Sequence, residues 1–244
     1  SSSSASLTTL SILQADITRV PAPNGSRAPV NASNGRLIFG TGIAGALRKA
    51  GGIGPENECN ALMDLYGQSG INTLPAGTAT ITSCGQMNHC KKMIHAIGPQ
   101  IAQGSMPTEE HMYRLQVTYE QVYRLAGSAN LQILILPLLS TGVFGFGMLQ
   151  GMKIALYAAL KTLPNYGIRR VIIVHNTTTV VQQFMALIGG NNELSFSTRA
   201  EADTLLQTYC SPFIPTYSAS MKRTVDSEIE AVWKITERFI TCFV

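Results

Sequence analysis

Two glycine-containing loops carry the clearest chemical signal in this chain. The first runs from Asn31 to Gly45 and holds Gly40-Thr41-Gly42 directly before a predicted helix, and the second runs from Ser140 to Gly147. Glycines before a helix N-terminus leave backbone N–H groups free to surround a phosphate, and the helix dipole adds to the attraction. Each loop alone is equally compatible with a tight turn.

Neither loop follows a known phosphate-binding fingerprint. Both lack the G-x-G-x-x-G and Walker spacings, and the second loop has no lysine that could meet a phosphate. The two loops nevertheless follow two strands of one predicted sheet. The pair therefore favours a diphosphate that is held from both sides.

Asp16 is the third candidate, because it stands at the end of the first predicted strand. A carboxylate in that position can accept a hydrogen bond from an exocyclic amine, such as that of adenine. The alternative is a structural role, in which Asp16 caps a turn or a helix.

The elements that must position these residues alternate between strand and helix. Strands are predicted over residues 7–13, 28–30, 78–83, 91–97, 131–136 and 170–174, and helices over 44–50, 58–66, 108–126, from the second glycine loop to 163, and 180–188. Such alternation indicates an α/β domain with a largely parallel central sheet. Ligands bind at the carboxyl ends of such strands. The loops after Leu13, Val30, Leu136 and Val174 are therefore the ones expected to matter.

The residues after 190 differ from the alternating part. Residues 191–197 are polar, and two amphipathic helices are predicted to follow them. We divide the chain into a tail (1–6), an α/β domain (7–190) and a helical extension (191–244). The extension either packs on the domain or leads to a flanking domain or partner.

Composition narrows the choice of function. The formal charge is +4, and charged residues make up 13%, against about 25% in an average domain. Basic residues occur as isolated pairs, so a nucleic-acid partner is not expected. The longest apolar run, residues 131–139, is too short to span a membrane.

The five scattered cysteines fit a reducing compartment with unpaired thiols, and the spacing of Cys84, His89, Cys90 and His95 is unusual for zinc, so we expect no metal and no cofactor.

Four motifs, in order along the chain, resemble the macro domain. They are Asp16-Ile17-Thr18, the run from Val30 to Asn34, the run from Gly40 to Leu47, and the run from Leu136 to Gly145. The resemblance covers about residues 6 to 188 and is closest to viral X domains of the coronavirus kind. It implies a three-layer α/β/α fold with a mixed, mostly parallel sheet, followed here by the helical appendage.

The resemblance also implies an ADP-ribose pocket with a role for each matched position. Asp16 and Ile17 would bind adenine, and the amides of both loops would bind the diphosphate. Asn34 would hold the distal ribose, with Phe144 packed against it, and these two with Gly42 form the implied catalytic set. The implied ligand-binding residues are Asp16, Ile17, Ala32, Asn34, Gly40, Thr41, Gly42, Ile43, Ser140, Thr141, Gly142, Val143, Phe144, Val174 and Asn176. His175 is interpreted as a satisfied residue at a strand end.

The implied activity is removal of mono-ADP-ribose from acidic side chains of modified proteins, in the cytoplasm (of a host cell if the protein is viral). Some family hydrolases carry an aspartate where this chain has Ala44. Thr41 stands within the family's glycine triplet, where it would crowd the site if the position required a positive φ or a close approach to the distal ribose. Both departures favour the alternative of a non-catalytic ADP-ribose reader. A nucleic-acid-binding module is the third alternative.

Overall fold

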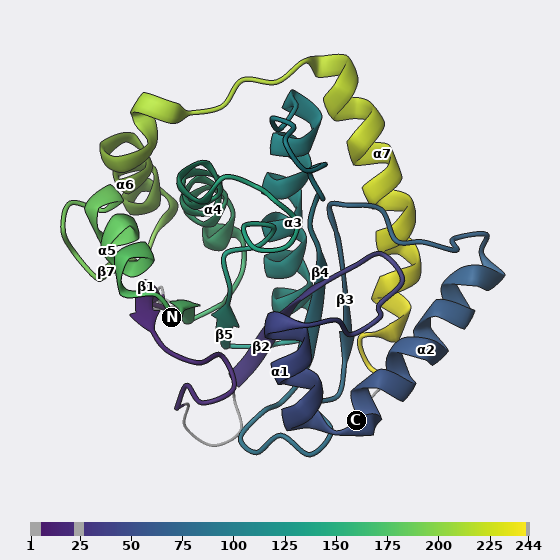
Figure 1. Cartoon of the computed structure of the whole chain (residues 1–244). Coiled ribbons are helices and arrows are strands. Elements are labelled where there is room, and N and C mark those ends of the chain that lie inside the picture. Colours follow the sequence, from purple (N-terminus) through teal and green to yellow (C-terminus); the bar gives the residue numbers. More distant parts are fainter. Residues whose placement is uncertain (1–5, 22–26, 243–244) are drawn as a thin grey trace, which may run out of the picture.

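A computed structural model describes residues 6–21 and 27–242, and its centre is one seven-stranded sheet (Figure 1). The strands are β1 (Thr8–Gln14), β2 (Arg27–Ser33), β3 (Thr78–Thr82), β4 (Met93–Ile97), β5 (Ile133–Leu136), β6 (Arg170–His175) and β7 (Glu193–Phe196). Their order is β3-β4-β2-β5-β6-β1-β7. The inner strands are parallel, and β3 and β7 run antiparallel to their neighbours at the two edges. The predicted mixed, mostly parallel sheet is confirmed.

Helices cover both faces of the sheet. They are α1 (Gly42–Gly51), α2 (Ile53–Gln68), α3 (Glu109–Ser128), α4 (Met148–Thr162), α5 (Thr178–Leu187), α6 (Arg199–Cys210) and α7 (Ala219–Thr236). On β5, Leu134 and Leu136 pack into the cluster formed with α3 and α4, whereas Ile133 and Ile135 pack with Leu47 of α1 on the other face. A strand covered on both faces is apolar at every position. The α/β/α layering is thereby confirmed.

Helix α2 is longer than predicted, and strand β7 was not predicted. Helix α2 begins at Ile53 rather than at residue 58, with Pro55 in its first turn. Proline is tolerated there because the first amides of a helix have no intrahelical partner. Strand β7 lies beyond the predicted domain boundary at residue 190 and pairs with β1. The sheet therefore continues into the region that we assigned to a purely helical extension.

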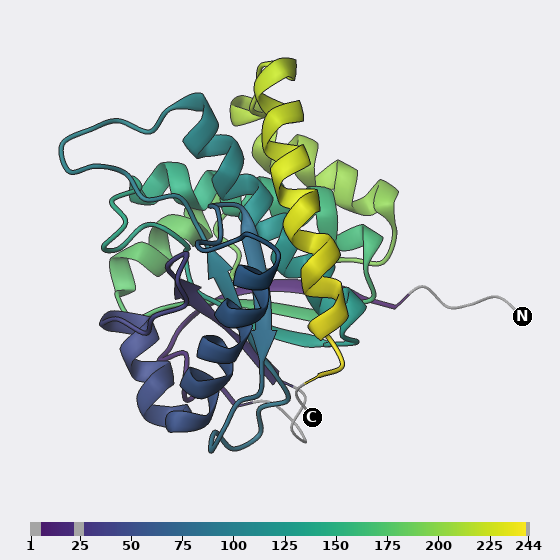
Figure 2. The same cartoon turned by 90° about the vertical axis from the view of Figure 1, so that its right-hand side faces the viewer.

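The C-terminal helices pack on the domain, which agrees with the first of the two alternatives for the extension. Figure 2 shows α7 lying along the side of the molecule next to β3, which it contacts. Tyr66 of α2 joins its hydroxyl to Thr80 of β3 at 2.9 Å and to Thr236 of α7 at 2.7 Å. The Arg124 guanidinium lies 4.1 Å from the Trp233 ring centroid and 2.8 Å from Glu230. Buried hydroxyl pairs and a cation–π contact attach α7 to the sheet and to α3.

The cysteines correct one expectation. Cys84 and Cys90 form a disulfide, so the prediction of unpaired thiols was wrong for this pair, while Cys59, Cys210 and Cys242 are free. Both cysteines lie in the loop between β3 and β4, and their spacing in the sequence does not predict how that loop folds. None of the helices described is long and apolar enough to cross a membrane.

Candidate functional site

A cleft of about 410 Å³ lies at the carboxyl ends of β1, β5 and β6, beside the N-terminus of α1. It receives residues from each of the loops expected to matter, so the topology brings together segments that are far apart in the sequence. The lining residues are Ala15, Asp16, Ile17, Gly42, Ile43, Ala46, Pro137, Leu138, Thr141, Gly142, Val174, His175 and Asn176.

Asp16 is held at one end of this cleft by its own turn. Its Oδ1 accepts hydrogen bonds from the Thr18 backbone N–H at 2.8 Å and from the Thr18 hydroxyl at 2.7 Å. These bonds, the backbone one first, lower the pKa of Asp16 below its ordinary value. The Asp16 side chain is 49% exposed, and its Oδ2 lies 3.8 Å from Arg19. The turn-capping role that we set against a ligand role is therefore present, and it leaves Oδ2 to accept a further bond.

The floor of this end is apolar. Ile17 is 5% exposed and packs in one cluster with Leu47, Ile172 and Val174. His175 follows Val174, and its Nδ1 accepts a hydrogen bond from the Thr177 N–H at 3.1 Å, as expected of a satisfied strand-end residue. Burial lowers its pKa, so the neutral ring keeps its proton on Nε2. This end can therefore cover a flat heterocycle and offers a carboxylate at the edge.

The N-terminus of α1 forms the wall next to Ile17. Gly42 adopts φ +63°, which favours glycine, and a Cβ there would meet nothing within 4 Å. Thr41 has φ −92°, an ordinary value, so the predicted backbone conflict at this position does not exist. In the described chain, the Thr41 side chain makes no capping bond and the first turn of α1 carries no acidic residue. Free amides at a helix N-terminus form a site for an anion.

The second loop forms the opposite wall and is held in a fixed shape. Ser140 adopts φ +64°, and its carbonyl accepts from the Phe146 N–H at 2.8 Å. The Thr141 hydroxyl donates to the Leu138 carbonyl at 2.7 Å, and the Phe144 carbonyl accepts from the Ile101 N–H at 2.7 Å. Thr141 and Gly142 from this loop line the same cleft as Gly42 and Ile43, which is compatible with a diphosphate held by both loops.

Some predicted ligand residues lie outside the lining of this cleft. They are Ala32, Asn34, Gly40, Thr41, Ser140, Val143 and Phe144. Val143 lies beside it, in a hollow of about 560 Å³ that Gln100 and Gln103 also line. Ser140 is buried, which removes its side chain from the wall. The residues that line the cleft and were not predicted are Ala15, Ala46, Pro137, Leu138 and His175, all close in sequence to predicted ones.

Asn34 is occupied by its own loop. Its Nδ2 donates to the Ile38 carbonyl at 2.8 Å, and its Oδ1 accepts from the N–H groups of Arg36 and Ile38 at 3.1 Å each. These bonds use one of the two Nδ2 hydrogens among the described residues, so the other can donate to a ribose hydroxyl, as the resemblance implies. Its assigned role stays a prediction.

Comparison with known proteins places the chain in a family. The macro domain model matches residues 30–155, more than half of the chain, so this protein belongs to the macro domain family. A macro domain-containing protein of Streptomyces nogalater is 35% identical over 65% of this chain and 80% of its own length. Another from Cupriavidus necator is 34% identical over 63% and 82%. These relatives are bacterial and give no support to the viral subtype.

Solved structures agree with the fold. An Oceanobacillus iheyensis macrodomain carrying a glycine-to-valine change, with ADP-ribose, has a TM-score of 0.65 at 27% identity and covers 73% of this chain and 91% of its own. The same protein with ADP has a TM-score of 0.63 at 25% identity, covering 74% and 94%.

Proposed function

We propose that this protein binds ADP-ribose in the cleft between Asp16 and the two glycine loops. The observation that carries the proposal is that one cleft holds a carboxylate above an apolar floor and, next to it, unoccupied amides of a helix N-terminus facing a second loop. Adenine fits the first part, and a diphosphate fits the second. The relatives with ADP-ribose and with ADP support the same ligand.

Isothermal titration calorimetry with ADP-ribose tests this proposal. The wild-type chain should bind one ADP-ribose, and Asp16→Ala should bind it more weakly. Asp203→Ala, which removes an exposed carboxylate of α6, is the matched control and should bind like wild type. Absence of saturable binding by the wild-type chain would contradict the proposal.

Hydrolysis of mono-ADP-ribose from protein side chains is the second candidate function. Three Oceanobacillus iheyensis variants change an asparagine, a glycine and an aspartate. The glycine follows the asparagine by seven residues, and the aspartate follows the glycine by three. Asn34, Thr41 and Ala44 have the same spacing in this chain. The variant with valine at the middle position has ADP-ribose bound, which supports the view that a β-branched residue such as Thr41 is compatible with binding.

Because position 44 is alanine rather than aspartate, Asp16 is the one carboxylate among the described residues that line the cleft. An attacking water would then have to be positioned by the substrate's own phosphate, while Asn34 orients the sugar. Positioning of the water and the sugar, rather than a pair of carboxylates, would then accelerate the reaction. Incubation with a mono-ADP-ribosylated protein beside the Asn34→Ala variant tests this. Release by wild type that Asn34→Ala abolishes, with most binding kept, supports hydrolysis, whereas no release by wild type leaves a reader.

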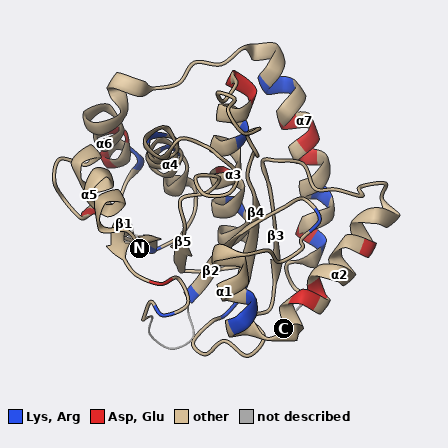
Figure 3. Cartoon of the chain, in the orientation of Figure 1, with Lys and Arg blue, Asp and Glu red and all other residues tan. Residues whose placement is uncertain are grey.

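Nucleic-acid binding has weaker support. Figure 3 shows Lys and Arg spread over separate elements. Affinity for an oligonucleotide falls steeply with added salt, whereas a diphosphate held by backbone amides loses much less. A salt titration of both ligands therefore separates the two functions.

A further inference from the structure

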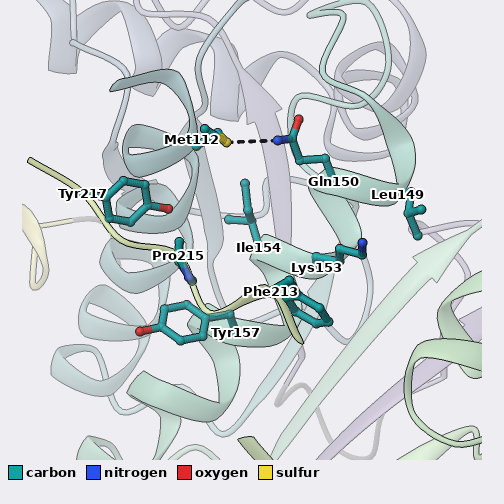
Figure 4. Close-up of a pocket in the computed structure, with 9 residues that line it drawn as sticks. All are labelled: Met112, Leu149, Gln150, Lys153, Ile154, Tyr157, Phe213, Pro215 and Tyr217. Atoms are coloured by element: carbon teal, nitrogen blue, oxygen red, sulfur yellow. Dashed lines mark hydrogen bonds between the residues drawn. The ribbon is translucent and has the colours of Figure 1, made fainter. Parts of the chain in front are cut away.

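A second cavity, of about 400 Å³, lies between α3, α4 and the segment that joins α6 to α7 (Figure 4). It shares no lining residue with the nucleotide cleft. Its volume is within the range of small-molecule sites, about 300–1,000 Å³. The lining residues are Met112, Leu149, Gln150, Lys153, Ile154, Tyr157, Phe213, Pro215 and Tyr217.

The walls suit a flat, apolar molecule. Phe213 and Pro215 come from the connecting segment and Tyr157 from α4, and the buried Ile154 also lines the cavity. Aromatic rings and a proline offer large rigid faces, which favour stacking of another planar group. Met112 accepts a hydrogen bond from Gln150 Nε2 at 3.0 Å, which closes the side of the cavity near α3.

One polar group at the cavity has an unmet hydrogen bond. The Tyr217 hydroxyl is buried and has no hydrogen-bond partner among the described residues, and Figure 4 shows it pointing toward the middle of the cavity. Burial raises the pKa of Tyr217, and nearby Tyr157, Glu120 and Glu109 raise it further. The hydroxyl therefore stays protonated and can donate. A buried donor without a partner destabilises the fold, and a ligand acceptor would remove that cost.

A positive charge lies on the other side. Lys153 Nζ is 5.3 Å from the Phe213 ring centroid, and no carboxylate of the described residues lies within ion-pair distance of it. Figure 4 places Lys153 and Tyr217 on opposite sides of the cavity. Because Glu109 and Glu120 are near Tyr217, an anionic group is favoured at Lys153 and disfavoured at the Tyr217 end.

We infer that this cavity binds an elongated aromatic carboxylate that carries a neutral hydrogen-bond acceptor at its far end. The ligand carboxylate pairs with Lys153, and the ring lies between Tyr157, Phe213 and Pro215. The acceptor at the far end accepts a hydrogen bond from the Tyr217 hydroxyl. The site is independent of the proposed ADP-ribose function, because the two cavities share no residue.

The probes are p-coumarate, which has a phenol oxygen opposite its carboxylate, and cinnamate, which lacks that oxygen. Calorimetry on the full chain should show saturable binding of p-coumarate, not displaced by ADP-ribose. Lys153→Met keeps the aliphatic stem and should weaken both probes by about fivefold or more. Lys49→Met, an exposed lysine of α1, is the matched control and should change neither affinity.

Tyr217→Phe removes only the hydroxyl. It should weaken p-coumarate by about fivefold and leave cinnamate unchanged, a difference that a general packing defect would not produce. The inference is overturned by no saturable binding of p-coumarate, by equal affinity in wild type and Lys153→Met, or by a Tyr217→Phe effect that is the same for both probes, including no effect on either. Displacement of p-coumarate by ADP-ribose would also overturn it, because the probe would then occupy the nucleotide cleft.

Discussion

The Asp16→Ala change tests the nucleotide end of the cleft most directly, and its magnitude follows from the geometry of the carboxylate. Oδ1 is taken by two hydrogen bonds from Thr18, so only Oδ2 can accept from an adenine amine. A hydrogen bond to a charged group contributes about 1.5–3 kcal/mol. The Asp16 side chain is 49% exposed, which places the bond at the weak end of that range. We expect ADP-ribose affinity to fall by about tenfold.

The assay is calorimetry at constant salt, with Thr18→Val as a second variant. Thr18→Val removes one of the two donors to Oδ1 and keeps the backbone one, so it should reduce affinity much less than Asp16→Ala. The Thr18 hydrogen bonds lower the pKa of Asp16 from its ordinary value of 3.8, so the carboxylate is ionised between about pH 7 and about pH 5, and wild-type affinity should be flat over that range. An affinity of Asp16→Ala within twofold of wild type would refute the reasoning and leave Asp16 with its turn-capping role alone.

Three further changes have outcomes that the contacts determine. Gly42→Ala should lower the free energy of unfolding by about 1–2 kcal/mol. The cost comes from the backbone φ of +63°, since the added Cβ would meet no atom, and any shift of this backbone away from +63° should also weaken ADP-ribose binding; equal stability in urea titration would contradict this. Thr236→Val should lower the free energy of unfolding by about 1–3 kcal/mol, since it leaves the buried Tyr66 hydroxyl with Thr80 alone; an unchanged urea midpoint would exclude that role. Reduction of the Cys84–Cys90 disulfide should lower the melting temperature, because it releases a short closed loop worth about 2 kcal/mol; calorimetric scans with and without dithiothreitol measure this, and coincident scans would count against it.

The sheet and its ligand edge could be predicted because they depend on local patterns. Residues 131–136 read as a continuous apolar strand, and the structure covers that strand on both faces. The glycine loops and Asp16 were identified by position, because parallel strands bring their carboxyl ends to one edge. Of the residues missed at the cleft, Pro137 has no chemical signal of its own, and His175 was interpreted as a satisfied strand-end residue rather than as a ligand residue.

The pairing of β7, the disulfide and the hydrogen bonds of Asn34 could not be predicted, because the sequence spacing does not specify them. Strand β7 is short and polar on one side, and it forms only because β1 offers an open edge. The Cys84–Cys90 bond depends on how a loop folds back. The hydrogen bonds that occupy Asn34 arise from the turn after β2 rather than from the identity of the motif.

The position of α7 against β3 has a consequence for the solubility of the chain. Strand β3 is the last strand on its side of the sheet, and a strand in that position has backbone groups that can recruit a strand from another molecule. Helix α7 shields this strand, with Thr236 joined through Tyr66 to Thr80 at its centre. Forms shortened to end before Ala219 would therefore expose the edge of β3, and we expect them to self-associate more than the 244-residue chain.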